Sequence, residues 1–229
     1  MRRRRVGVLV SGRGSNLQAL LDACADPAFP AEVALVISNV PGVYALERAA
    51  AAGVASCVIP HKPFPSREAF DAAMDAELRR AGIEIVCLAG FMRLLSAGFV
   101  AGWRDRMINI HPALLPSFKG LHTHQRALDA GVRLHGCTVH LVTPDLDDGP
   151  ILVQAAVPVL SGDDADALAA RVLEQEHRIY PLALRLLAED RIRVVGNRAE
   201  IDAPGPAGAL VNPDVWRPAG ASAGEGVAR

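Results

Sequence analysis

The chain has 229 residues, a length that suits one α/β domain, or at most one domain with an appendage. Lysine and arginine total 24 against 25 for aspartate and glutamate, so the formal charge of −1 gives no electrostatic reason to expect nucleic acid or an anionic membrane as a partner. A small-molecule substrate is the better expectation.

The start of the chain does not resemble an export signal. The basic run Arg2–Arg5 is followed by an apolar stretch, Val6–Val10, that is shorter than the hydrophobic region of a signal peptide. No apolar run approaches the ~20 residues that a membrane span requires. The four cysteines are widely spaced among apolar or small residues, as is typical of buried structural thiols: Cys24, Cys57, Cys87 and Cys137. We therefore expect a cytoplasmic protein without disulfides.

Short apolar runs that are typical of buried strands recur along the chain, at Val6–Val10, Val33–Ile37, Ala55–Ile59, Ile83–Leu88, Met107–Ile110, Thr138–Val142 and Ile151–Val157. Helical patterns separate the early runs, at Asn16–Ala25, Val43–Ala52 and Arg67–Arg80. This alternation implies parallel strands joined by right-handed crossovers. The prediction is an α/β fold with a Rossmann-like, doubly wound, mostly parallel sheet of about seven strands flanked by helices.

A glycine-containing loop, Ser11–Leu17, follows the first predicted strand. Glycines allow a tight turn, and backbone amides at the start of the next helix can bind an anion, so a phosphate fits there. The loop is not a complete dinucleotide-binding motif, because Leu17 stands where a third glycine would be. An ordinary strand-to-helix turn, with Ser15 or Asn16 as the helix N-cap, explains the same residues.

Asn109 and His111 alternate at a predicted strand end, so their side chains point to the same side. An amide can hydrogen-bond a developing oxyanion while an imidazole moves protons, a combination that suits acyl transfer. Asp147 lies in a second polar loop, Thr143–Pro150, and a carboxylate near His111 would orient the imidazole and favour its protonated form. Loops at the carboxyl ends of strands line the ligand crevice in such sheets, so we expect the active site there.

Each of these residues also has a purely structural explanation: Asn109 as a loop hydrogen-bonder, His111 as a buried histidine with a partner, and Asp147 as a turn-former. Four other histidines suggest a metal site: His122, His124, His135 and His140. No glutamate stands at H-E-x-x-H spacing and no cysteine pair accompanies them, so we expect no metal.

A long helical pattern, Asp163–Ala188, follows the last predicted strand, and acidic residues suit its N-terminal end. We expect Tyr180-Pro181 to kink or divide this helix. After Ala203 the composition turns to alanine, glycine and proline, which is typical of weak structure. The sequence therefore predicts one domain over residues 1–202 and a tail over 203–229.

Four stretches together are specific: Ser11–Ala19, Leu88–Arg93, Asn109–Pro116 and Gly120–His124. On these stretches the sequence resembles the phosphoribosylglycinamide formyltransferase family, over about Val6 to Ile201. The resemblance implies transfer of a formyl group from 10-formyltetrahydrofolate, as cosubstrate, to the glycine amine of N1-(5-phospho-D-ribosyl)glycinamide. The products would be the N2-formyl compound and tetrahydrofolate, in de novo purine (IMP) biosynthesis.

The resemblance also implies roles for individual residues. Asn109, His111 and Asp147 match the family's catalytic residues. The ribonucleotide and its phosphate would be held by Gly14, Ser15, Asn16 and Glu176. Folate-binding positions match Arg67, Met92, Arg93, Leu94, Leu95, Asn109, Pro144, Asp145, Leu146, Asp147 and Asp148.

Two positions depart from the family pattern. Leu173 stands where a polar partner for the ribonucleotide is expected. Asp148 follows the catalytic aspartate where a small residue is usual, which would add charge near His111 or crowd the loop.

Relatives that share the folate-binding module give alternative functions: methionyl-tRNA formyltransferase, formyltetrahydrofolate hydrolase and the hydrolase domain of formyltetrahydrofolate dehydrogenase. A tRNA-acting relative needs an additional basic domain, and we expect the hydrolase to carry an amino-terminal regulatory domain, whereas Val6 here already begins the catalytic sheet. A non-catalytic nucleotide-binding module is a more remote alternative. The expected partners are small molecules, not nucleic acid or membrane. The sequence is compatible with a homodimer and does not decide the oligomeric state.

Overall fold

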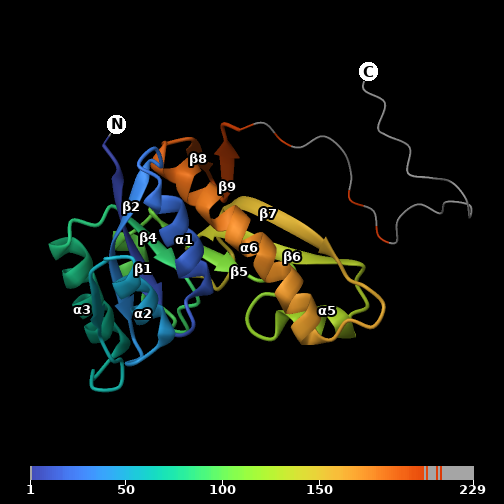
Figure 1. Ribbon diagram of the computed structural model, residues 1–229, viewed down its shortest axis with the longest axis horizontal. Coiled ribbons are helices and arrows are strands. Elements are labelled where there is room, and N and C mark those ends of the chain that lie inside the picture. Colours follow the sequence, from blue (N-terminus) through green and yellow to red (C-terminus); the bar gives the residue numbers. More distant parts are fainter. Residues whose placement is uncertain (1, 204, 206–209, 211, 213–229) are drawn as a thin grey trace, which may run out of the picture.

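Seven strands form one sheet in the order β3-β2-β1-β4-β5-β6-β7 (Figure 1). The strands are β1 (Arg4–Val10), β2 (Ala31–Ser38), β3 (Ser56–Val58), β4 (Ile85–Leu88), β5 (Met107–His111), β6 (Leu134–Leu141) and β7 (Ile151–Pro158). β1 to β5 pair in parallel, whereas β6 runs antiparallel to both β5 and β7. The predicted doubly wound, mostly parallel sheet is confirmed.

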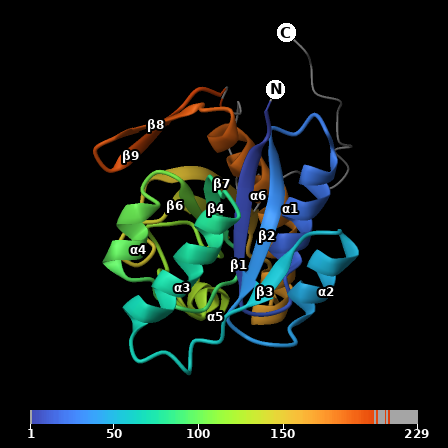
Figure 2. The same ribbon diagram turned by 90° about the vertical axis from the view of Figure 1, so that its left-hand side faces the viewer.

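Helices cover both faces of the sheet (Figure 2). One face packs against α1 (Ser15–Ala25), α2 (Tyr44–Ala51), α5 (Thr123–Asp129) and α6 (Ala165–Ala188). The other face packs against α3 (Arg67–Arg80) and α4 (Ala97–Gly102). Two hydrophobic cores result, one on each side of the sheet.

The first strand shows how the sequence produces this arrangement. Val6, Val8 and Val10 are fully buried in the core beneath α1 and α6, while Leu9 is fully buried in the core beneath α3 and α4. Because side chains alternate between the faces of a strand, a sheet covered on both sides requires a continuous apolar run. Polar residues that could bind or transform a ligand are therefore expected mainly at the ends of strands and in the loops that follow them.

The helix α6 is continuous over 24 residues, with Pro181 inside it. Of the two effects expected of Tyr180-Pro181, a kink or a division, division of the helix is therefore wrong. Proline removes a helical hydrogen bond, but Tyr180 beside it is fully buried, and its hydroxyl lies 2.9 Å from the carbonyl oxygen of Leu88 and 3.3 Å from that of Ile108. These contacts tie α6 to β4 and β5 close to the candidate site.

Four short elements are not predicted by the sequence patterns: α4, α5, β8 (Ile192–Val195) and β9 (Arg198–Ile201). The two helices have six and seven residues, too few for helical periodicity to stand out. The two strands form a hairpin around Gly196-Asn197, with Gly196 at φ +62°. Gly-Asn between apolar runs is a hairpin signal that could have revealed it.

The structure, a computed structural model, describes residues 2–203, 205, 210 and 212. Most of the predicted tail, residues 203–229, lies outside the described residues. In the described part, no helix is both long enough and apolar enough to cross a bilayer. The four cysteines are free thiols.

Candidate active site

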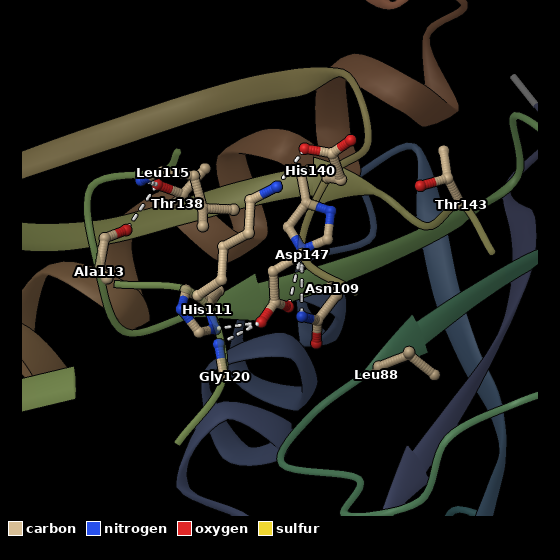
Figure 3. Close-up of polar contacts among 12 residues, drawn as sticks. Leu88, Asn109, His111, Ala113, Leu115, Gly120, Thr138, His140, Thr143 and Asp147 are labelled. Carbon is tan, nitrogen blue, oxygen red and sulfur yellow. Dashed lines mark hydrogen bonds and ion pairs between the residues drawn. The ribbon is translucent and has the colours of Figure 1, made fainter. Parts of the chain in front are cut away.

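Asn109 and His111 lie at the carboxyl end of β5 (Figure 3). Ile108 and Ile110 point into the core on the α1 and α6 side, so Asn109 and His111 both point to the opposite side of the sheet. His111 is 5% exposed, and Asn109 is partly buried. The amide and the imidazole therefore share one largely enclosed region, as the alternation of side chains along a strand predicts.

Asp147 reaches the same region from the loop between β6 and β7. Its Oδ2 lies 3.4 Å from Nδ1 of His111 and accepts a hydrogen bond of 2.9 Å from the backbone amide of Gly120. Its backbone is left-handed, at φ +49°, a conformation that aspartate adopts more readily than most non-glycine residues. The structure thus brings the three predicted catalytic residues together.

The route by which Asp147 arrives differs from the sequence-based expectation. Because β6 is antiparallel to β5, the end of β6 lies beside the start of β5, where the amide of Val142 donates to the carbonyl of Met107 at 2.9 Å. The loop that carries Asp147 therefore starts beside the amino end of β5 and folds back toward His111 at the carboxyl end. It does not share the edge at which the parallel strands end.

His140 is a fourth polar residue of the cluster, and sequence reasoning considered it only as a metal ligand. In the strand register it stands opposite Asn109, with Nε2 3.2 Å from Nδ2 of Asn109 and 3.7 Å from Oδ1 of Asp147. Its Nδ1 lies 2.9 Å from the carbonyl oxygen of Leu141, which can only accept, so Nδ1 carries the proton and Nε2 is the acceptor in the neutral ring. Only the antiparallel register, which the sequence does not specify, would have revealed this pairing.

The protonation of His111 is set by opposing effects. Burial lowers the pKa of His111 below its ordinary value of 6.5, and the charges of His140 and Arg126 act in the same direction. The carbonyl of Phe118 and the carboxylate of Asp147 raise the pKa of His111, but they do not outweigh burial. Asp147 therefore favours the imidazolium as predicted, yet the net pKa shift favours the neutral ring.

The tautomer of neutral His111 follows from its contacts. Nε2 lies 3.0 Å from the carbonyl oxygen of Phe118, so Nε2 carries the proton and Nδ1 has the free lone pair. Burial tends to raise the pKa of Asp147, but His140 and His111 in their protonated forms, together with the amide of Gly120, outweigh burial and lower it. A carboxylate thus faces the unprotonated nitrogen of the imidazole.

Asp148, the departure next to Asp147, is exposed. Its carboxylate pairs with Lys119, and both side chains are more than a third exposed. An exposed and paired carboxylate has little effect on a buried imidazole. Of the two expected effects, an influence of the Asp148 charge on His111 is not seen, because Asp148 is not among the groups that shift the pKa of His111.

The glycine loop ends β1 and begins α1. Gly14, not Ser15 or Asn16, is the N-cap residue, at φ +71°, and no side chain caps the first turn. A side chain at this position would meet Cα and Cβ of Ala45 at 2.9 and 2.7 Å, so only glycine lets α2 pack this closely. The uncapped N–H groups of the first turn can donate hydrogen bonds to an anionic ligand.

Glu176 joins this loop from α6. It is 7% exposed, and its Oε2 accepts a hydrogen bond of 2.7 Å from Nδ2 of Asn16, whereas Oδ1 of Asn16 is buried without a partner in the described residues. Burial raises the pKa of Glu176 more than the contact with Asn16 lowers it. Leu173 precedes Glu176 by one helical turn and is partly buried, and it offers no polar atom.

Large apolar side chains are exposed in three loops around the cluster: Met92 at 68%, Leu94 at 57%, Leu121 at 67% and Leu146 at 55%. Met92 and Leu94 belong to the loop after β4, and the amide of Met92 donates to Oγ of Ser11 at 2.8 Å, which joins this loop to the glycine loop. Exposed apolar groups around polar residues are typical of a ligand site.

The other predicted folate residues differ in their placement. Arg93, Pro144 and Asp145 are exposed in the same loops, whereas Leu95 is partly buried against the core beneath α3 and α4. Arg67 is the exposed first residue of α3, and within the described part of the chain no hydrogen bond or ion pair joins its side chain to the cluster. No group of three or more His, Cys, Asp or Glu side chains in the described residues is placed to hold a metal ion.

The sequence profile of a family described as formyl transferase matches residues 4–184. The chain belongs to the formyl transferase family. A formyl transferase of Escherichia coli, phosphoribosylglycinamide formyltransferase, is 47% identical over 195 residues, which cover 85% of this chain and 92% of that protein. The trifunctional purine biosynthetic protein adenosine-3 of Drosophila pseudoobscura is 56% identical over 84% of this chain.

This chain spans only 14% of the length of the trifunctional protein, but nearly all of the bacterial formyl transferase. Among solved structures, glycinamide ribonucleotide transformylase 1 from Symbiobacterium toebii superimposes with a TM-score of 0.85 at 50% identity. That match covers 87% of this chain and 94% of the other. The fold and the formyl transferase family are thus shared along most of the chain.

Proposed function

We propose that this protein transfers the formyl group of 10-formyltetrahydrofolate to the glycine amine of N1-(5-phospho-D-ribosyl)glycinamide, in the cytoplasm, as a step of de novo purine biosynthesis. The observation that carries the proposal is the placement of the Asn109 amide and the His111 imidazole side by side at the end of β5, with Asp147 behind them. The names of the bacterial relatives support this choice of substrates.

Asn109 stabilises the charge that forms when the amine attacks the formyl carbon. Attack makes a carbon–nitrogen bond and moves the carbonyl electron pair onto oxygen. One N–H of the Asn109 amide is directed to His140, which leaves the second N–H to donate to this oxygen. A donor that is already oriented stabilises the developing oxyanion without reorganisation.

His111 moves the proton between the two nitrogens. Its Nδ1 is the unprotonated ring nitrogen, so it accepts the proton that the attacking amine loses. The imidazolium that forms is stabilised by Oδ2 of Asp147 at 3.4 Å, and its charge also favours the oxyanion. When the carbon–nitrogen bond to folate breaks, His111 returns the proton to the folate nitrogen, directly or through a water molecule.

The surroundings of the cluster suit the two substrates. Exposed Met92, Leu94 and Leu146 offer apolar contact to a pterin ring, together with the neighbouring predicted folate residues. The uncapped first turn of α1, from Gly14 to Asn16, offers backbone amides to the phosphate, and Glu176 lies beside it. The formyl group would then lie between these two regions, next to His111.

The test is an assay of purified protein with 10-formyltetrahydrofolate, with and without glycinamide ribonucleotide, followed by the absorbance of the folate product. The proposal predicts folate release only when the ribonucleotide is present. Equal release without the acceptor would indicate a hydrolase, and no release under either condition would favour a binding module.

A further inference from the structure

We propose that Arg126, on α5, is a positioning residue that holds His111 and Asp147 in place through the backbone of the loop 118–121. This inference rests on the proposed function, because it concerns the same catalytic pair. Arg126 touches neither His111 nor Asp147 directly. It acts through the peptide groups that bind them.

The loop 118–121 contacts both members of the pair. The carbonyl of Phe118 accepts from Nε2 of His111 at 3.0 Å, and the amide of Gly120 donates to Oδ2 of Asp147 at 2.9 Å. One contact fixes the tautomer of the imidazole, and the other fixes the direction of the carboxylate. A movement of this loop would therefore displace both catalytic groups at once.

Local preference does not explain the shape of this loop at Phe118, which is left-handed at φ +55°. Gly120, at φ +80°, adopts that conformation readily. A bulky residue such as phenylalanine rarely adopts that conformation, which costs of order 1–3 kcal/mol unless the surroundings impose it. Contacts from outside the loop must therefore stabilise it.

Arg126 supplies several of those contacts from α5. Its Nη1 donates to the carbonyl of Lys119 at 2.6 Å and lies 3.4 Å from the carbonyl oxygen of Leu121. Its guanidinium carbon lies 5.7 Å from the centre of the Phe118 ring, a cation–π distance. The ring of Phe118 also packs edge-on against the ring of buried His135, with 5.8 Å between the two ring centres. A single cation thus binds the loop on both sides of Gly120 and beside Phe118.

The charge of Arg126 adds an electrostatic effect, because it lowers the pKa of His111 in addition to burial. Other ionisable groups also face His111 or lie next to it, from β6, α5 and the two loops: His135, His140, His124, Lys119, Asp147 and Asp148. None of these groups is changed when Arg126 alone is substituted. Loss of the Arg126 charge alone would therefore raise the pKa of His111, whereas a displaced loop would lower it, because the contacts with Phe118 and Asp147 raise this pKa.

Two variants and one control separate positioning from general stability. Arg126→Gln removes the cation, and Arg126→Lys keeps the charge with fewer donors. The control is Arg106→Gln, because Arg106 makes the same kinds of contact far from the cluster, donating to the carbonyl of Gly102 at 2.9 Å with its guanidinium carbon 5.0 Å from the Trp103 ring centre.

We expect Arg126→Gln to lower kcat by roughly three- to tenfold with little change in either KM, and Arg126→Lys to recover part of this loss. NMR titration of the His111 imidazole, assigned by comparison with His111→Ala, should show a lower midpoint in Arg126→Lys than in the wild type, because this variant keeps the charge but holds the loop less firmly. Arg106→Gln should leave kcat and this midpoint unchanged.

An unchanged kcat in Arg126→Gln or an unchanged His111 midpoint in Arg126→Lys would overturn the inference, as would losses that Arg106→Gln reproduces. Failure of the proposed function is a separate result, since it would be seen as wild-type protein that transfers no formyl group. The NMR titration does not depend on turnover and still tests the inference in that case.

Discussion

Asn109 and His140 face each other across the antiparallel pair β5–β6, with Nδ2 of the amide 3.2 Å from Nε2 of the ring. Because Nδ1 of His140 donates to the carbonyl of Leu141, Nε2 can only accept while the ring is neutral. The contact therefore fixes which end of the Asn109 side chain carries its N–H groups, and it leaves one N–H for the substrate.

A double-mutant cycle tests this relationship. Asn109→Ala should lower kcat by ~10²–10³, the usual effect of losing one oxyanion donor. His140→Ala should lower kcat by a smaller factor, roughly tenfold, because the amide stays but is no longer oriented. If His140 acts through Asn109, the double variant should be no slower than Asn109→Ala alone. Multiplied losses would show that His140 acts independently.

The sequence predicts the parts of this site that depend on local pattern. The alternation of side chains along one strand predicts that Asn109 and His111 lie on the same side of the sheet, and the apolar runs predict its strands. His140 and the backbone of Phe118 were not predicted, because their roles depend on an antiparallel register and on a loop conformation set by distant contacts. The direction of the Asp148 side chain likewise depends on Lys119, 29 residues away in the chain.

The pH dependence of His111 follows from its lowered pKa. Because burial favours the neutral ring in the folded protein, we expect an NMR midpoint below the ordinary value of 6.5. The stability that this group contributes should be present above its unfolded pKa and should be lost as pH falls toward its folded pKa. Turnover should fall over the same acidic range, since neutral His111 accepts the amine proton. A midpoint above 7 would contradict this description.

Tyr180 should contribute to stability more than to chemistry. Tyr180→Phe removes the hydroxyl that contacts the buried carbonyls of Leu88 and Ile108. We expect urea denaturation to show that the free energy of unfolding falls by about 1–3 kcal/mol. The chain has two tyrosines, and the other, Tyr44, is 53% exposed, so Tyr44→Phe is a matched control that should change stability little. Equal effects of the two substitutions would argue against these buried contacts.

Glu176 should affect binding of the ribonucleotide more than the chemical step. Glu176→Ala removes the partner of Nδ2 of Asn16 beside the glycine loop, so KM for glycinamide ribonucleotide should rise roughly tenfold while KM for the folate stays nearly constant. Glu174→Ala, at an exposed position on the same helix, is the control and should leave both KM values unchanged. A rise only in the KM for the folate would show that Glu176 does not help to bind the ribonucleotide.

The most direct test of formyl transfer by His111 is the turnover of His111→Ala with 10-formyltetrahydrofolate and glycinamide ribonucleotide. We expect a loss of kcat of at least ~10², because the imidazole is the group placed to move the proton, with circular dichroism and urea denaturation still showing a folded protein. Near-wild-type turnover by folded His111→Ala would contradict this expectation.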